Sequence, residues 1–425
     1  MQISINEARL RDELSALSRF THAEPAANGT AVTRIVFSGD DLRARSWLKS
    51  LAQDAGFSVR EDAVGNTFIR WAGTEPELPA VGTGSHIDAI PHAGMYDGTV
   101  GVLGGLEALR SLKGSGVRLK RSLELVMLTS EEPTRFGIGC LGSRLMAGVL
   151  DPARADALKD LENPPKPGEE QATLAKVRTI AGFTGSLSSV LLPKGYYYGW
   201  IELHIEQGPL LEREGLPLGI VTSIAAPAGY RFTISGIGGH AGALLMPDRR
   251  DALCAAAELI LSIEKHALGT GVIDTVATVG TCEVYPGAVN SVPSRVVLQV
   301  DLRDTEPERR ESVIEAVRGD CEGIRKRRGV IVTEELVNAD APAHSSPHIV
   351  ETLEAICKED GFRYKRMVSR AYHDSLFMAR IAPIAMLFIP CRQGVSHRPD
   401  EYAASEDIAR GTRVLAETLA RLASE

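Results

Sequence analysis

The spacing of apolar residues in the first half of the chain predicts helices and strands in alternation. Apolar positions recur at helical spacing over residues 6–20, 40–55 and 98–112. Short apolar or alternating runs, the pattern of strands, cover residues 57–71, 80–84, 123–129 and 198–205. Strands that alternate with helices of this length favour an α/β domain with a mainly parallel sheet.

A second pattern begins near Val221. It predicts, in order, a strand, a helix, two strands, a helix and a strand, at residues 230–236, 248–266, 275–285, 295–303, 306–328 and 329–338. This β-α-β-β-α-β order is typical of a ferredoxin-like domain. We therefore expect an inserted domain at residues 222–338 between two parts of a larger domain, residues 1–221 and 339–425. Helices are expected in the last part at residues 347–360 and 405–422.

Composition excludes several classes of partner. The 425 residues carry a net charge of −8 without a basic block, so nucleic acid is not expected to bind. No run approaches the ~18 apolar residues that span a bilayer, so no membrane is expected. The N-terminus lacks the apolar core of a signal peptide, and the six cysteines are scattered without a CxxC pair. These features favour a reducing, cytoplasmic compartment.

Acidic and imidazole groups gather at predicted strand ends and in tight loops. The segments are residues 84–88, 96–98, 130–133, 202–208 and 394–397. Ligands of parallel sheets collect at the carboxyl ends of the strands, where two of these segments lie. A lone histidine is more often structural, but mixed histidine and carboxylate groups suit zinc, manganese or cobalt. Together the segments predict a metal site.

The residue spacing suggests individual roles. His86 and Asp88 are two apart on an extended chain and share a face, so His86 is expected to bind metal while Asp88 accepts its second ring N–H. Asp97 opens a helix, where it could cap the helix or bridge two metals. Glu131 and Glu132 are adjacent carboxylates at a buried strand end, which is costly without cations. One is expected to bind metal and the other to act as general base.

Three further residues give weaker signals. His240 lies between glycines in Gly238–Gly242, where it could reach an oxyanion, although a plain turn is the alternative. Arg303 ends a predicted strand and could bind a carboxylate in bidentate fashion, although a surface arginine is equally expected. Asn290 lies in a predicted hairpin and is uninformative by itself.

The segments GSHIDAIPHAGMYDG, TSEEPTRFG, ELHIEQGP, GGHAG and GVSH resemble the amidohydrolase/carbamoylase branch of the dinuclear metallopeptidases. This branch includes allantoate amidohydrolases, N-carbamoyl-L-amino-acid hydrolases and ureidoglycolate amidohydrolases. The resemblance covers the chain from about Thr33 to the last helix. It implies an α/β metallopeptidase-like catalytic domain and an inserted ferredoxin-like α+β domain that serves as lid and forms a homodimer.

The resemblance also implies a site with two divalent metal ions. Manganese is expected, with zinc, cobalt or nickel as alternatives. The first ion would be held by His86, Asp97 and His204, and the second by Asp97, Glu132 and His397. Glu131 matches the general base and His240 a catalytic histidine of the lid. The matching substrate-binding positions are Gln207, Asn290, Arg303 and His373.

One segment narrows the expected substrate. Residues 369–375 read SRAYHDS, where many carbamoylases have small residues in place of Arg370 and Tyr372. This departure resembles the ureidoglycolate amidohydrolases, and two larger polar side chains would suit a small ureido acid; in the alternative reading they point outward. Hydrolysis of the ureido amide of ureidoglycolate is therefore expected. The alternatives are another ureido acid, a dipeptidase or deacylase activity, and a binding protein without catalysis.

Overall fold

The computed structural model describes residues 3–425, which form two compact units. Unit 1 contains the chain up to Thr222 together with His344–Met367 and His373–Glu425. Unit 2 contains Ser223–Ala343 and Val368–Tyr372. The short segment Val368–Tyr372 falls in unit 2 because Ala225 donates its N–H to the Ser369 carbonyl and Arg370 pairs with Asp274. The sequence pattern did not predict that the chain returns to unit 2 at this segment.

A nine-stranded sheet forms the centre of unit 1, in the order β15-β8-β17-β7-β4-β6-β3-β2 with β16 beside β8. Strands β17, β7, β4 and β6 pair in parallel, and β8, β3 and β2 add antiparallel pairs. This confirms the predicted α/β fold with a mainly parallel sheet. The bounds are β2 (Ser58–Glu61), β3 (Thr67–Trp71), β4 (Ala80–His86), β6 (Leu123–Leu128), β7 (Tyr197–Ile205), β8 (Leu218–Ile224), β15 (Ala343–His344), β16 (Tyr364–Ser369) and β17 (Ile384–Ile389).

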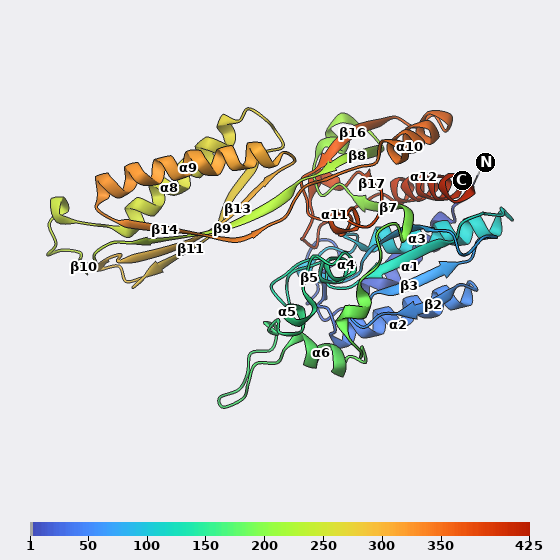
Figure 1. Ribbon diagram of the computed structural model, residues 1–425, viewed down its shortest axis with the longest axis horizontal. Coiled ribbons are helices and arrows are strands. Elements are labelled where there is room, and N and C mark those ends of the chain that lie inside the picture. The colour runs from blue at the N-terminus through green and yellow to red at the C-terminus, as the bar shows by residue number, and fades with distance from the viewer. Residues whose placement is uncertain (1–2) are drawn as a thin grey trace. The chain divides into compact units, whose positions relative to one another are not determined.

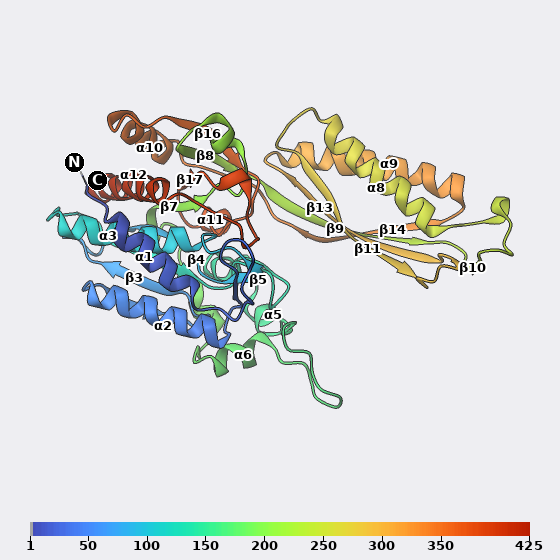
Figure 2. The same ribbon diagram turned by 180° about the vertical axis from the view of Figure 1, so that it is seen from behind.

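Helices bury the central strands, which explains their continuous apolar runs: every residue of β6 and β17 is buried. Helices α3 (Thr99–Gly114) and α12 (Ser405–Ser424) pack on the sheet, with α1 (Glu7–Ser18) against them. Helix α11 (Ser375–Met378) packs on β7 and β17 and contacts α4 (Leu141–Met146). Figures 1 and 2 show α3 and α12 beside the sheet from opposite sides.

The remaining elements of unit 1 are short or peripheral. Strands β1 (Val32–Arg34) and β5 (Ala89–Ala93) form a separate antiparallel pair that the sequence pattern did not predict. Ser38 caps α2 by accepting the Asp41 N–H. The other bounds are α2 (Gly39–Asp54), α5 (Pro152–Asp156), α6 (Leu174–Ile180), η1 (Leu187–Val190), α7 (Leu210–Glu214), α10 (Pro347–Glu359) and η3 (Arg392–Gly394).

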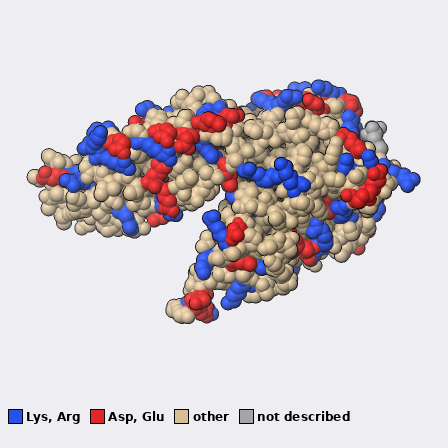
Figure 3. Space-filling model, in the orientation of Figure 1, with Lys and Arg blue, Asp and Glu red and all other residues tan. Residues whose placement is uncertain are grey.

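Unit 2 has the predicted β-α-β-β-α-β order. Its antiparallel sheet runs β11-β13-β9-β14, and burial alternates along β9 because one face packs on α8 and α9. Acidic and basic side chains are mixed over the visible face of this unit, without a patch of one sign (Figure 3). The bounds are β9 (Ala226–Ser235), β10 (Gly239–His240), η2 (Met246–Asp248), α8 (Ala252–Gly269), β11 (Val276–Tyr285), β12 (Ser291–Val292), β13 (Arg295–Asp304), α9 (Pro307–Arg328) and β14 (Ile331–Ala339).

Membrane-spanning helices were not expected. Over residues 3–425, no helix combines the length and the apolar character that crossing a bilayer requires.

Candidate metal centre

Three neighbouring strands of unit 1 end at one edge of the sheet with the residues singled out above. Strand β4 ends at His86, β7 carries His204 one residue before its end, and β6 is followed by Glu131 and Glu132. These strands are parallel to one another, so their carboxyl ends meet at the same edge. Asp97 lies at this edge just before α3.

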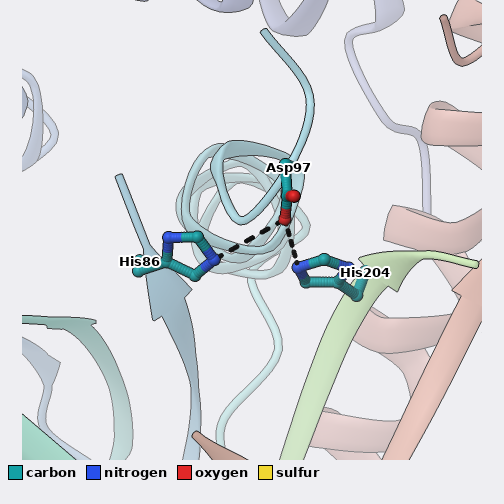
Figure 4. Close-up of side chains that lie close together, drawn as sticks. All are labelled: His86, Asp97 and His204. Atoms are coloured by element: carbon teal, nitrogen blue, oxygen red, sulfur yellow. Dashed lines mark ion pairs between the residues drawn. The ribbon is translucent and has the colours of Figure 1, made fainter. Parts of the chain in front are cut away.

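The Asp97 carboxylate lies between two groups of side chains. Its Oδ1 is 3.7 Å from Nε2 of His86 and 3.2 Å from Nε2 of His204 (Figure 4). Its Oδ2 is 3.1 Å from Nε2 of His397, which is also 3.3 Å from Oε1 of Glu132. The structure thus brings together two possible metal-binding groups, His86–Asp97–His204 and Asp97–Glu132–His397, that share Asp97.

Backbone carbonyls orient the two buried imidazoles. Nδ1 of His86 lies 3.0 Å from the Asp88 carbonyl, and Nδ1 of His204 lies 2.9 Å from the Ile205 carbonyl. Each Nδ1 therefore donates its proton there, and each Nε2 presents a lone pair. A lone pair facing a carboxylate oxygen is repulsive unless a proton or a cation lies between them. This donor set fits a divalent transition metal.

The buried carboxylates around Asp97 also favour the binding of cations. The carboxylates of five residues are buried in this region, and no Lys or Arg of residues 3–425 pairs with any of them: Asp88, Asp97, Glu131, Glu132 and Asp374. Burying like charges together without a counter-ion costs several kcal/mol. The cluster would be stabilised by divalent ions.

The charges shift the pKa values of the cluster in opposite directions. Burial lowers the pKa of His86 and His204, but the neighbouring carboxylates, Asp97 foremost, outweigh burial and raise both above their usual value. Burial raises the pKa of Asp97, but the neighbouring imidazoles of His204, His397 and His86 outweigh burial and bring it well below its usual value. Burial raises the pKa of Glu131 well above its usual range, and the charge of Glu132 adds to this.

Glu131 and Glu132 point in different directions from one turn. Ser130 before them has a φ of 56°, a conformation that bends the chain after β6. Oε2 of Glu131 lies 3.9 Å from Nε2 of His86, and the Cys140 thiol donates to its Oε1 at 3.5 Å. Glu131 therefore lies beside the first group without belonging to it, whereas Glu132 belongs to the second.

Asp88 does not make the predicted hydrogen bond with its carboxylate. The nearest carboxylate oxygen is 3.8 Å from Nδ1 of His86, which bonds the Asp88 carbonyl instead. The carboxylate accepts the backbone N–H groups of Glu131 and Glu132 at 3.3 and 3.1 Å. Because two backbone donors follow the bend at Ser130, they hold the Asp88 side chain away from the ring. Asp88 thus joins the turn after β6 to the loop after β4.

The residues expected to bind substrate divide between the two units. In unit 1, Gln207 donates its Nε2 to Oδ2 of Asp97 at 2.8 Å, and buried His373 lies edge-on to His204 with ring centroids 4.5 Å apart. In unit 2, Gly242 donates its N–H to Nδ1 of exposed His240 at 3.2 Å, which leaves the proton on Nε2. Asn290 is exposed, and Arg303 pairs with Asp301 at 2.8 Å.

Sequence reasoning missed two residues beside Asp97. Glu401 accepts the backbone N–H groups of Tyr96 and Asp97. The Ser396 hydroxyl lies within hydrogen-bond distance of both the Glu401 and the Asp97 carboxylates, and its single proton serves one of them at a time. Burial raises the pKa of Glu401 to about 7, and the charge of Asp97 adds to this. Ser396 could have been suspected as the neighbour of His397. Glu401 lies in an irregular segment where no periodic pattern indicates burial.

Comparison with known proteins agrees with this geometry. Residues 82–421 match the model of peptidase family M20/M25/M40. The chain belongs to this family. It is 52% identical over 396 residues to a ureidoglycolate hydrolase of Oryza sativa subsp. japonica, with 92% of this chain and 80% of that protein covered.

Two further comparisons point the same way. An N-carbamoyl-L-amino acid amidohydrolase of Geobacillus stearothermophilus is 40% identical, with 92% of this chain and 93% of that protein covered. The crystal structure of AtUAH in complex with (S)-hydroxyglycine superposes with a TM-score of 0.86 at 48% identity, covering 100% of this chain and 99% of that one.

Proposed function

We propose that this chain hydrolyses the ureido amide of (S)-ureidoglycolate. One water enters, and two ammonia, one carbon dioxide and one glyoxylate leave. Loss of the first ammonia and of carbon dioxide gives hydroxyglycine, which then loses the second ammonia. The rice relative is a ureidoglycolate hydrolase at 52% identity, and the similar AtUAH structure holds (S)-hydroxyglycine, which fits this sequence of products.

The residues around Asp97 would hold two divalent cations, of which manganese is expected and zinc, cobalt or nickel are alternatives. His86, Asp97 and His204 would hold one, and Asp97, Glu132 and His397 the other. When bound, such cations polarise a carbonyl oxygen and lower the pKa of water. The hydrogen bonds from both Nδ1 atoms to backbone carbonyls fix His86 and His204 in the tautomer that this binding needs.

Glu131 is the residue proposed to move the proton. Its carboxylate is buried beside His86, and burial raises its pKa above the usual range, which favours uptake of a proton. It would accept a proton from the water that attacks the ureido carbon and then pass that proton to the departing nitrogen. The turn held by Asp88 keeps this carboxylate next to the first metal-binding group.

The residues of unit 2 have proposed roles in binding. Arg303 would exchange Asp301 for the carboxylate of the substrate, since a guanidinium binds a carboxylate in bidentate fashion. His240 carries its proton on Nε2 and would donate it to the oxyanion. Gln207, Asn290 and His373 would contact the rest of the substrate. Formation of a homodimer through unit 2 and a cytoplasmic location stay predictions.

The observation that carries this proposal is the buried Glu131 beside two metal-binding groups that share Asp97, in a chain 52% identical to a ureidoglycolate hydrolase. The test is ammonia release from (S)-ureidoglycolate, N-carbamoyl-L-alanine and allantoate at equal manganese loading. We expect kcat/KM for ureidoglycolate to exceed the other two by about 10⁴-fold, the discrimination of a site that hydrogen-bonds a substrate hydroxyl against analogues that lack it.

The variant Glu131→Gln tests the role of Glu131 as the base. It should retain manganese and lose about 10²- to 10⁴-fold in kcat, because the amide cannot take up the proton. Preference for N-carbamoyl-L-alanine would instead support the second candidate, the activity of the Geobacillus relative. Unchanged turnover by Glu131→Gln would refute the role of the base.

A further inference from the structure

The Glu401 carboxylate contacts two distant segments of unit 1. Its Oε1 accepts the backbone N–H groups of Tyr96 and Asp97 at 2.8 and 3.1 Å. Its Oε2 accepts the hydroxyl of Ser396 at 2.8 Å. One side chain therefore joins the loop that carries Asp97 to the loop that carries His397.

The Ser396 hydroxyl also lies beside the Asp97 side chain. Oγ of Ser396 lies 3.0 Å from Oδ2 of Asp97, the oxygen that also faces His397. Gln207 donates its Nε2 to this oxygen at 2.8 Å and to Oγ of Ser396 at 3.3 Å. The position of Ser396, next to His397 in the chain, is thus fixed relative to the carboxylate shared by the two groups.

The Glu401 side chain is buried and closely packed. The residue is only 3% exposed. A Cβ atom at Gly94 would lie 2.4 Å from Cβ of Glu401 and 2.5 Å from its Oε1, so a side chain at Gly94 would displace it. Gly94 lies just before the loop that Glu401 holds. The contact is therefore a packed, interior feature and not a chance meeting of surface groups.

His397 depends on such support more than the other histidines do. His86 and His204 lie on central strands, and their side chains are 3% and 1% exposed. His397 follows η3 in an irregular segment, has a φ of 59°, and its side chain is 45% exposed. His397 itself lies in no helix or strand. Backbone hydrogen bonds are made by the flanking residues Val395, Arg398 and Pro399, and the Ser396 side chain adds to this support.

We propose that Glu401 is a positioning residue that holds Asp97 and His397 in place for the metal ion of the group Asp97–Glu132–His397. This inference rests on the proposed function, because that function requires the second ion. Glu401 would not contact the reacting atoms. It acts through the Asp97 backbone and through Ser396, and it sets the affinity and the number of bound ions.

The test counts metal ions in variants of the full chain. Chelator-stripped protein is titrated with manganese chloride, and bound manganese is measured after dialysis. The unaltered chain should bind two ions. Glu401→Ala should bind one ion as tightly as before and the other about 10- to 100-fold more weakly, the usual effect of removing a residue that orients a ligand.

The conservative variant separates positioning from bulk stability. Glu401→Gln keeps an oxygen for the two backbone N–H groups and gains an amide that can donate to Ser396, so it should bind two ions nearly as the unaltered chain does. The milder variant Ser396→Ala removes the hydroxyl that contacts Glu401, Asp97 and Gln207, and it leaves the bonds from the Tyr96 and Asp97 backbone to Glu401 in place. It should weaken the second ion, and it tests the inference even if Glu401→Ala fails to fold.

A matched control is Glu107→Ala. Glu107 is also buried, but it bonds Asn6, Arg9 and Ser111 and does not contact either metal-binding group. This variant should lose stability and still bind two ions. Two ions at unchanged affinity in Glu401→Ala, or the same loss of an ion in Glu107→Ala, would overturn the inference alone. Fewer than two ions in the unaltered chain would overturn the proposed function as well.

Discussion

Gly98 places Asp97 against the two buried histidines. It has a φ of 67°, which L residues rarely adopt, and a Cβ there would lie 2.4 Å from Nε2 of His86. Its N–H also donates to Nε2 of His204 at 3.1 Å. We expect Gly98→Ala to displace His86, to weaken the ion held by His86, Asp97 and His204, and to lower the free energy of unfolding by about 1–3 kcal/mol. Manganese titration and urea denaturation measure both effects.

The control for this substitution lies at the other end of the helix that Gly98 precedes. Gly114 ends α3, and a Cβ there would meet open space. Gly114→Ala should bind two ions and be unchanged or slightly stabilised, because alanine lowers the entropy of the unfolded chain. If Gly98→Ala also binds two ions at unchanged affinity, the packing argument for Gly98 is wrong.

At the residue scale, the sequence predicted which residues form the site better than it predicted their individual hydrogen bonds. Segments of mixed histidine and carboxylate at strand ends predicted which residues would meet, because parallel strands end at one edge. The same pattern did not predict which group each histidine ring nitrogen would hydrogen-bond. Asp88 shares a face with His86, yet its carboxylate bonds the Glu131 and Glu132 backbone, since the bend at Ser130 turns those N–H groups toward it.

Among the elements, an ion pair supports the segment after Glu132. Arg135 donates to both oxygens of Asp160 at 3.1 and 2.9 Å and to the Val36 carbonyl at 2.8 Å. Burial raises the pKa of Asp160, but the hydrogen bonds and charge of Arg135 outweigh it and lower that pKa. The folded protein therefore keeps this carboxylate charged at a lower pH than the unfolded chain does, where the pKa is about 3.9.

The sign of the pH dependence follows from this pair. Its contribution is present above the unfolded pKa and is lost as pH falls through the lowered, folded value. Asp160→Asn should lower the free energy of unfolding by about 1–3 kcal/mol at pH 7. The difference from the unaltered chain should shrink below about pH 4. Urea denaturation at pH 3–7 measures it, and a difference that stays constant over this range would contradict the prediction.

Elements with strong periodicity were predictable, and short ones were not. The split β-α-β-β-α-β order of unit 2 and the buried run of β6 followed from the pattern, because long helices and alternating strands repeat their signal. Strands β1 and β5 have only three and five residues and pair with each other across the chain. Their existence depends on a long-range partner, which a local pattern does not contain.

For the whole molecule, removal of bound metal should lower both the activity and the stability of the fold. The buried carboxylates around Asp97 repel one another, and within residues 3–425 no Lys or Arg pairs with them. Ions that bind only the folded state stabilise it by about 2.7 kcal/mol at a concentration 100 times the Kd. We expect chelator treatment to abolish ammonia release and to lower the Tm by several degrees, and manganese to restore both.

The dependence on metal concentration makes this prediction specific. Because the gain grows with the logarithm of free ion, the Tm should keep rising as manganese increases beyond the Kd. His397→Ala should reduce the rise, since it removes a ligand from one of the two groups. Magnesium prefers oxygen ligands and is a control that should raise the Tm less. A stripped protein with unchanged Tm and full turnover would show that the carboxylates and imidazoles around Asp97 do not serve to bind metal.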